Sequence, residues 1–192
     1  MSLVFDIGQG VGLAGATGVR PFLPPLLAGA LALGDLGIDF EATDWSFLES
    51  PGFLLAVLAV AVIAYAAERS GANRRAVAVG SALIALVLGA LLFAGSLADG
   101  GHSGLPGLLA GAACAALAYA SVGGLLDRAA RRLDQGAAGL LTVYADLIAL
   151  ALAAIAILVP PVAFLALAVF LLLLVKGRRS EDRKYAGLRI LR

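Results

Sequence analysis

Long apolar runs dominate this sequence and decide what it can fold into. Charged residues, glycines and prolines divide them into six segments: Leu3–Leu33, Pro51–Ala67, Ala76–Ala98, Gly104–Leu126, Ala138–Val159 and Val162–Val175. Most of them approach the roughly 20 residues that a helix needs to cross a bilayer. Because lipid offers the backbone no hydrogen-bond partners, an open-ended segment in the membrane must be helical. The sequence therefore predicts an all-α polytopic membrane protein with about six transmembrane helices, built as one membrane domain over residues 1–192.

The composition excludes a water-soluble globule. Hydrophobic residues make up 61% of the chain, charged residues make up 14%, and the mean hydropathy is +0.99. A soluble domain averages roughly 45–50% apolar and about 25% charged residues. A formal net charge of +1 gives no electrostatic basis for a nucleic-acid partner. We therefore expect the lipid bilayer to be the main partner.

The chain lacks the residue sets that carry most enzyme chemistry. His102 is its only histidine, so no histidine-based metal cluster or triad can form, and we expect His102 to be a solvated loop residue. Cys114 is its only cysteine, which excludes an internal disulfide. No phosphate-binding or dinucleotide motif and no nucleophile–base set is present. The sequence predicts a protein that is not an enzyme, with no catalytic residues, no metal and no cofactor.

The basic residues indicate how the chain crosses the membrane. All of them except Arg20 follow the second, fourth and sixth runs: Arg69, Arg74 and Arg75; Arg128, Arg131 and Arg132; and Lys176 onward. With six spans, these three places share one face. The opposite loops contain no Lys or Arg, and their charged residues are all acidic: Asp35, Asp39, Glu41, Asp44, Glu49 and Asp99. The positive-inside rule then predicts a multi-pass protein of the plasma membrane with both termini in the cytoplasm.

The end of the chain is basic and has apolar residues at helical spacing. Residues 177–192 contain Tyr185, Leu188 and Leu191 among Lys and Arg residues. This pattern fits an amphipathic helix on an anionic membrane surface as well as an ordinary solvated tail.

Two short glycine-rich stretches suggest a duplication. Residues 8–16 match residues 104–112 at five positions, at an offset of 96 that is half the chain. Two halves of three spans each, over 1–100 and 101–176, would have opposite orientations in the membrane. This is the inverted repeat that many transporters share.

The first run is too long for one straight span and contains helix breakers. Its 31 residues would extend roughly 46 Å as a helix, against about 30 Å of hydrocarbon. Pro21 disfavours helical geometry at Arg20, and Pro24 and Pro25 remove two more backbone donors. Gly18 eases unwinding. We therefore predict a proline-broken first helix with its break at Arg20.

Arg20 marks the candidate substrate site, which comprises Arg20, Asp146, Thr142, Gly18 and Pro21. A central arginine is costly in a membrane unless it faces the bundle interior. Asp146 is the only acid in the middle of a predicted span, and Thr142 lies one turn before it. An Arg20–Asp146 pair could bind a small anion or polar group or act as a proton-linked carboxylate, or it could simply stabilise the bundle.

Two further features locate the first run. Gly8, Gly12, Ala16 and Arg20 recur every fourth residue, which predicts close packing against protein. Asp6, far from Arg20 along the helix, is expected at the cytoplasmic interface.

The opening stretch resembles a known family. The positions that carry the resemblance are Gly12, Gly15, Gly18, Arg20, Pro21 and Phe22, within "GQGVGLAGATGVRPFLPPLLAGAL". They are similar to the glycine-rich helix and Gly-hydrophobic-Arg-Pro-Phe motif of a bacterial family of small multi-span membrane proteins, domain of unknown function 4126. The resemblance implies a bacterial inner-membrane protein and no particular activity.

Two functions follow as alternatives. The first is a small transporter or channel for an anion or polar solute, with its site at the broken helix. The second is a structural or lipid-handling membrane protein in which the Arg20–Asp146 pair only stabilises the bundle. The glycine and alanine stripes suit packing within one chain or within a homo-oligomer.

Overall fold

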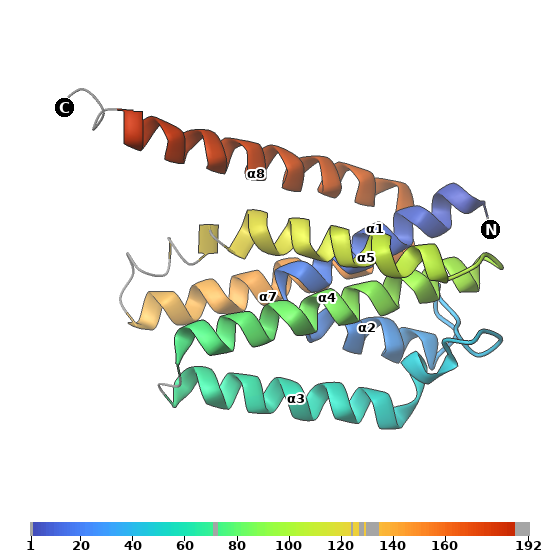
Figure 1. Ribbon diagram of the computed structural model, residues 1–192. Helices are drawn as coiled ribbons and strands as arrows, with labels where there is room; N and C mark the ends of the chain where they lie inside the picture. The colour runs from blue at the N-terminus through green and yellow to red at the C-terminus, as the bar shows by residue number, and fades with distance from the viewer. Residues whose placement is uncertain (1, 71–72, 124, 127–128, 130–134, 187–192) are drawn as a thin grey trace.

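The computed structural model describes residues 2–70, 73–123, 125–126, 129 and 135–186, and its regular structure is helical. The longer helices are α1 (Leu3–Val19), α2 (Leu23–Ala32), α3 (Pro51–Arg69), α4 (Arg74–Asp99), α5 (Leu105–Ala118), α7 (Gln135–Leu158) and α8 (Ala163–Ala186). Three short helical turns lie at Ser46–Glu49, Tyr119–Gly123 and Pro160–Val162. The predicted all-α membrane fold is confirmed (Figure 1).

Five helical stretches are long and apolar enough to cross a membrane. They are Pro51–Arg69, Arg75–Asp99, Leu105–Gly123, Gly139–Leu158 and Pro160–Gly177. The first apolar run is not among them, because it forms the two shorter helices α1 and α2. The chain thus has five candidate spans and one broken segment where about six spans were predicted.

The break lies at the predicted place. Helix α1 ends at Val19, and Arg20 is extended, with φ −142° and ψ 113°. Pro21 disfavours the helical conformation at the residue before it. Pro24 and Pro25 lie in the first turn of α2, where the backbone N–H groups have no helical partner in any case. The prolines therefore end one helix and begin the next.

Helices α1 and α2 form a hairpin that enters and leaves at the same end of the bundle. Close contacts order α1 antiparallel to α7, since Gly12 faces Ala156 and Arg20 faces Asp146. Gly37, which follows α2, packs against Ile157, and its carbonyl accepts a 3.0 Å hydrogen bond from Gln9 Nε2 near the start of α1. By Gly37 the chain has therefore returned to the end of the bundle where α1 begins.

This hairpin changes the predicted topology. The start of α1 and the end of α8 lie at opposite ends of the bundle, and the acidic connections after α2 and α4 share the end where α1 begins (Figure 1). The prediction that both termini lie in the cytoplasm rests on six crossings, whereas the helices give five candidate spans and a hairpin, and the orientation of the termini stays a prediction. Helix α8 continues to Ala186, so part of the predicted tail is helical, and the rest lies outside the described residues.

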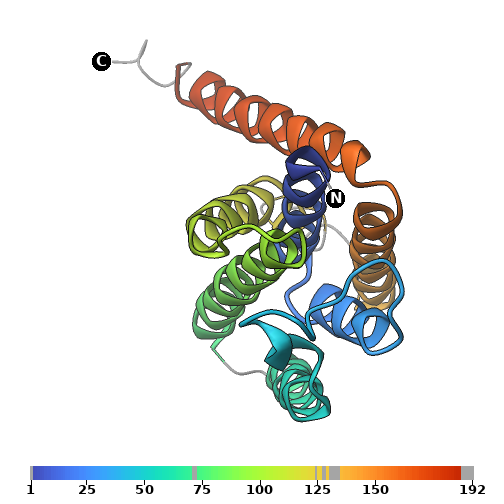
Figure 2. The ribbon, with the colours of Figure 1, turned by 90° about the vertical axis from the view of Figure 1, so that its right-hand side faces the viewer.

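Helix α1 is the centre of the bundle, enclosed by α4, α5, α7 and α8 (Figure 2). Its small residues allow this close approach. A Cβ at Gly8 would meet the Pro160 carbonyl oxygen at 2.6 Å, and a Cβ at Gly12 would overlap Ala156 and Ala163. The expectation that the Gly8–Gly12 stripe packs against protein is confirmed.

The inverted repeat is not confirmed by the helices that suggested it. Val11 and Ala14 of α1 pack beside Ala110 and Cys114 of α5, and Gly18, one turn further, packs against Ala118. The two helices therefore run in the same direction, whereas inversion would make them antiparallel.

Candidate functional site

Arg20 and Asp146 form the predicted ion pair. The extended backbone at the break directs the Arg20 side chain toward α7, where its Nε lies 2.7 Å from Asp146 Oδ1. Its Nη2 donates a 3.2 Å hydrogen bond to the Thr142 carbonyl oxygen. The charged side chains retain 20% and 21% of their exposure. The helix break thus places a paired, partly accessible guanidinium inside an apolar bundle.

Tyr65 joins this pair from a third element. Its hydroxyl donates a 3.0 Å hydrogen bond to Asp146 Oδ2. We name Arg20, Asp146, Tyr65 and the Thr142 carbonyl the break site. The expected site did not include Tyr65, although the sequence contains a signal for it. Phe53, Val57, Ala61 and Tyr65 recur every fourth residue along α3, which indicates one inward-facing stripe.

The break site lies nearer the basic end of the bundle than the acidic end. Tyr65 is one turn before the end of α3 at Arg69. Asp146 is about 10 Å along α7 from Gly139, where the apolar part of that helix begins. The guanidinium therefore sits within the membrane-spanning region, toward the face that the positive-inside rule assigns to the cytoplasm.

The geometry leaves Arg20 with spare donors. Among the described residues, neither Arg20 Nε nor Asp146 Oδ1 has an aligned hydrogen-bond partner, so their contact is an ion pair alone. A guanidinium has five N–H donors in a fork that matches phosphate or carboxylate oxygens. Nε and one N–H of Nη2 face Asp146 and Thr142, and no other residue that the structure describes engages the remaining N–H groups, which are open to an anion.

The other predicted site residues have different roles. Thr142 contributes its backbone carbonyl to Arg20. Pro21 is buried and makes the break. Gly18 faces α5, since a Cβ there would meet the Ala115 carbonyl oxygen and the Ala118 methyl group. The structure therefore brings Arg20, Asp146 and Thr142 together and assigns Gly18 to helix packing.

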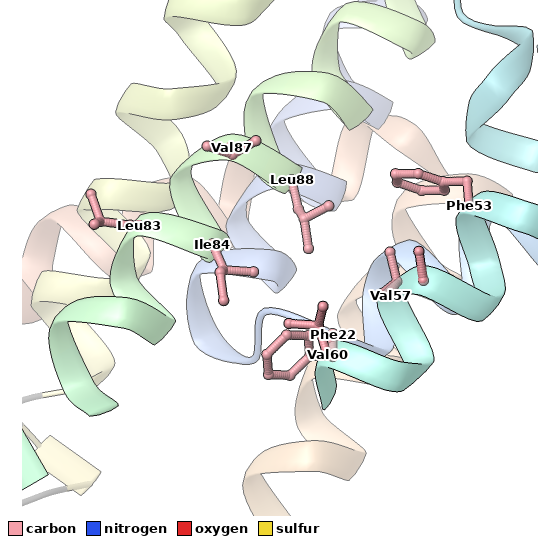
Figure 3. Close-up of a pocket in the computed structure, with 9 residues that line it drawn as sticks. Phe22, Phe53, Val57, Val60, Leu83, Ile84, Val87 and Leu88 are labelled. Atoms are coloured by element: carbon pink, nitrogen blue, oxygen red, sulfur yellow. The ribbon is translucent and has the colours of Figure 1, made fainter. Parts of the chain in front are cut away.

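An apolar groove opens between α3 and α4 beside the break (Figure 3). Its volume is about 330 Å³, and every side chain that lines it is apolar. Phe22 contributes from the break, and the walls include Phe53, Val57, Val60, Val87 and Leu88. The sequence did not reveal this groove, because it depends on how far the two helices stand apart.

A second polar cluster, also missed, holds the start of α1. Asp6 is only 2% exposed, and its Oδ2 lies 3.4 Å from His102 Nδ1. Ser96 Oγ is 2.9 Å from the Asp6 carbonyl oxygen and 3.0 Å from Gln9 Oε1. The expectation of a solvated His102 is thus only half right, because His102 is 39% exposed yet pairs with Asp6. Asp6 lies at the acidic end, not beside the basic loops.

No metal centre is evident in the part of the chain that the structure describes. No group of three or more His, Cys, Asp or Glu side chains there is placed to hold an ion. The break site itself has one carboxylate, which is already engaged by Arg20 and Tyr65.

Comparisons with known proteins give a family and nothing finer. The family described as Domain of unknown function (DUF4126) matches residues 7–179. Neither a curated protein nor a solved structure matches the chain.

Proposed function

The chain belongs to the DUF4126 family, whose description assigns no activity, and from that premise we propose that it is a small transporter or channel for an anion or anionic polar solute. Arg20 is the binding group, and Asp146 is its internal counter-ion. The resemblance of the opening motif to a bacterial family supports the inner membrane as its location. The basic end of the bundle would face the cytoplasm.

One observation carries this proposal: the charged pair at the break is partly exposed and is not held by a hydrogen bond between its two charged groups. Its side chains keep about a fifth of their exposure, and the Nε–Oδ1 contact lacks hydrogen-bond alignment. Irregular backbone at membrane depth is tolerated where it is buried in protein or lines a cavity. Half-helix ends at such breaks are a recurrent way of building transporter sites.

The arrangement suggests how an anion would be handled. The spare N–H groups of Arg20 bind its oxygens, while the Thr142 carbonyl keeps the guanidinium in place. An anion on Arg20 repels the Asp146 carboxylate unless that carboxylate moves away or takes up a proton. Tyr65 provides a donor that can hold Asp146 once Arg20 is engaged elsewhere. Asp146 therefore couples anion entry to a movement of charge.

A structural role is the second candidate, and one observation favours it. The break site ties α1, α7 and α3 together through Arg20, Asp146 and Tyr65. Buried ion pairs can hold a fold without binding anything, and breaking one partner of a buried pair costs about 3–5 kcal/mol. On this reading the pair stabilises the bundle and no solute crosses.

Flux measurements separate the two candidates. In proteoliposomes, Arg20→Ala and Asp146→Asn should each lower the flux of a transported anion at least about tenfold. A panel of phosphate, sulfate, chloride and small carboxylates, with a pH-sensitive dye to report protons, would identify the anion. The lone Asp146→Glu variant, which keeps the charge, should retain part of the flux.

Stability measurements provide the counterpart. If every anion and proton flux is unchanged in variants that remain folded, the transport proposal is wrong. A structural pair instead predicts that each single substitution lowers the unfolding temperature, and that Arg20→Ala combined with Asp146→Asn restores part of it.

A further inference from the structure

The α3/α4 groove leads toward the break site. Phe22 lines the groove and follows Arg20 and Pro21 in the chain. On α3, the groove residues Phe53 and Val57 continue through Ala61 to Tyr65, whose hydroxyl contacts Asp146. From Val57 to Tyr65 the helix rises only about 12 Å. The apolar groove and the charged break site are therefore neighbours along α3, close enough for one amphiphile to reach both.

Groove and break site together have the orientation of a lipid whose headgroup lies toward the basic end. The charged groups lie one turn from the end of α3, and the groove extends from the middle of α3 toward Phe53 near its start. The groove opens sideways, since Val87 and Leu83 at its rim are each 58% exposed among apolar helix faces. An apolar hollow in contact with acyl chains takes up hydrocarbon and leaves water out.

Charge complementarity selects an anionic headgroup. Arg20 presents N–H donors that no described residue engages, and Arg69 and Arg75 are exposed at the same end of α3 and α4. Basic residues at a membrane surface attract anionic lipids. A zwitterionic or neutral headgroup would gain less from these three arginines.

We propose that the ligand of the break site is an anionic lipid whose hydrocarbon chain lies in the α3/α4 groove and whose headgroup reaches Arg20. This inference rests on the proposed anion site and adds the chemical class of the ligand. A chain in the groove would contact Val60 and Val87, and an anionic oxygen at the other end would compete with Asp146 for the guanidinium. The site would then bind an amphiphilic anion more tightly than a free inorganic anion.

The experiment compares two probes with the same headgroup chemistry. Binding of dodecyl phosphate and of inorganic phosphate is measured on the full chain in nanodiscs of a zwitterionic lipid. Val60 lies in the wall of the groove, so Val60→Trp fills the groove with the larger side chain. Val62→Trp is the matched control, since Val62 lies on the opposite side of α3 and is 61% exposed.

The proposal expects dodecyl phosphate to bind at least about tenfold more tightly than inorganic phosphate. Val60→Trp should weaken dodecyl phosphate about tenfold and leave inorganic phosphate unchanged, while Val62→Trp alters neither. Arg20→Ala should weaken both probes. Val87→Trp, which fills the groove from α4, should repeat the effect of Val60→Trp, so a folding defect of one variant does not decide the test.

Three outcomes would overturn the inference. If inorganic phosphate binds at Arg20 as tightly as dodecyl phosphate and both groove variants are silent, the anion site stands and the lipid assignment is wrong. If dodecyl phosphate binds through the groove regardless of Arg20→Ala, the groove holds hydrocarbon without a headgroup site, which contradicts the inference. If neither probe binds at Arg20, the proposed function and this inference both fail.

Discussion

At the scale of single residues, the break site shows how a membrane bundle accommodates an arginine. A central arginine costs at least about 2.5–3.5 kcal/mol on insertion scales. Here Asp146 supplies the opposite charge, and the Thr142 carbonyl accepts from Nη2. Tyr65 in turn donates to the second oxygen of Asp146, so both carboxylate oxygens have a neighbour. The charge is thereby compensated while spare donors of Arg20 stay usable.

The Tyr65→Phe substitution tests how much the Asp146 carboxylate depends on its hydrogen bond from Tyr65. Tyr65→Phe removes only the hydroxyl, so the free energy of unfolding should fall by about 0.5–1.5 kcal/mol. Phosphate affinity at Arg20 should also fall, because Asp146 without this donor competes more strongly for the guanidinium. Chemical denaturation in detergent and phosphate titration provide the two readouts.

Tyr144 is the matched control for that substitution. It lies on α7 two residues before Asp146 and is 64% exposed. Tyr144→Phe should change neither stability nor affinity. Equal effects of the two substitutions would show that the Tyr65 hydroxyl has no specific role.

Prediction at this scale succeeded where the sequence offered a single choice. Asp146 is the only acid in the middle of a predicted span, so it was the one candidate counter-ion for Arg20. Tyr65 was missed because tyrosines near helix ends usually lie at the membrane interface, and Asp6 was expected at the cytoplasmic interface. Only packing shows that these two point inward.

At the scale of elements, glycine and alanine let α1 occupy the centre of the bundle. Without water to drive helices together, membrane helices associate through close packing of small residues. Gly8 and Gly12 face the α7–α8 connection and its flanks, and Gly18 faces α5. The break site depends on this fit, because a displaced α1 would move Arg20 away from Asp146.

Gly12 provides the test of that dependence. A Cβ at Gly12 would overlap the Ala156 methyl group and come within 2.8 Å of the Ala163 methyl group. Gly12→Ala should therefore lower stability by about 1–3 kcal/mol through overpacking. Thermal unfolding monitored by circular dichroism measures the change.

Gly80 on α4 is the control position, where an added methyl group should not lower stability. A Cβ there meets nothing within 4 Å. Gly80→Ala should be neutral or slightly stabilising, since alanine favours a helix over glycine. If Gly12→Ala is as harmless as Gly80→Ala, close packing of α1 does not set the position of the break site.

At the scale of the whole molecule, the hairpin of α1 and α2 decides the topology. Five candidate spans and one returning segment place the start of α1 and the end of α8 at opposite ends (Figure 1). The Asp6 cluster anchors this arrangement at the acidic end. There, Ser96 of α4 and His102 of the next connection contact the first turns of α1.

Cysteine labelling tests this topology directly. In a Cys114→Ser background, an impermeant thiol reagent is applied to sealed right-side-out vesicles carrying Ser2→Cys, Ser103→Cys or Ser70→Cys. Ser2 and Ser103 lie at the acidic end, and Ser70 follows α3 at the basic end. Ser2→Cys and Ser103→Cys should react from outside, whereas Ser70→Cys should react only after permeabilisation. If Ser2→Cys instead reacts only after permeabilisation, as Ser70→Cys does, the first segment crosses the membrane.

The sequence by itself determined the class of the protein and the chemistry of its break site. Apolar run lengths fix a helical membrane fold because lipid leaves the backbone no other way to satisfy its hydrogen bonds. Pro21 favours the break because its ring disfavours helical backbone at Arg20. Only the tertiary structure decided that α2 returns, that Tyr65 reaches Asp146 and that a groove separates α3 from α4. These features depend on which helix faces meet, and an apolar sequence that suits lipid and protein equally does not specify that.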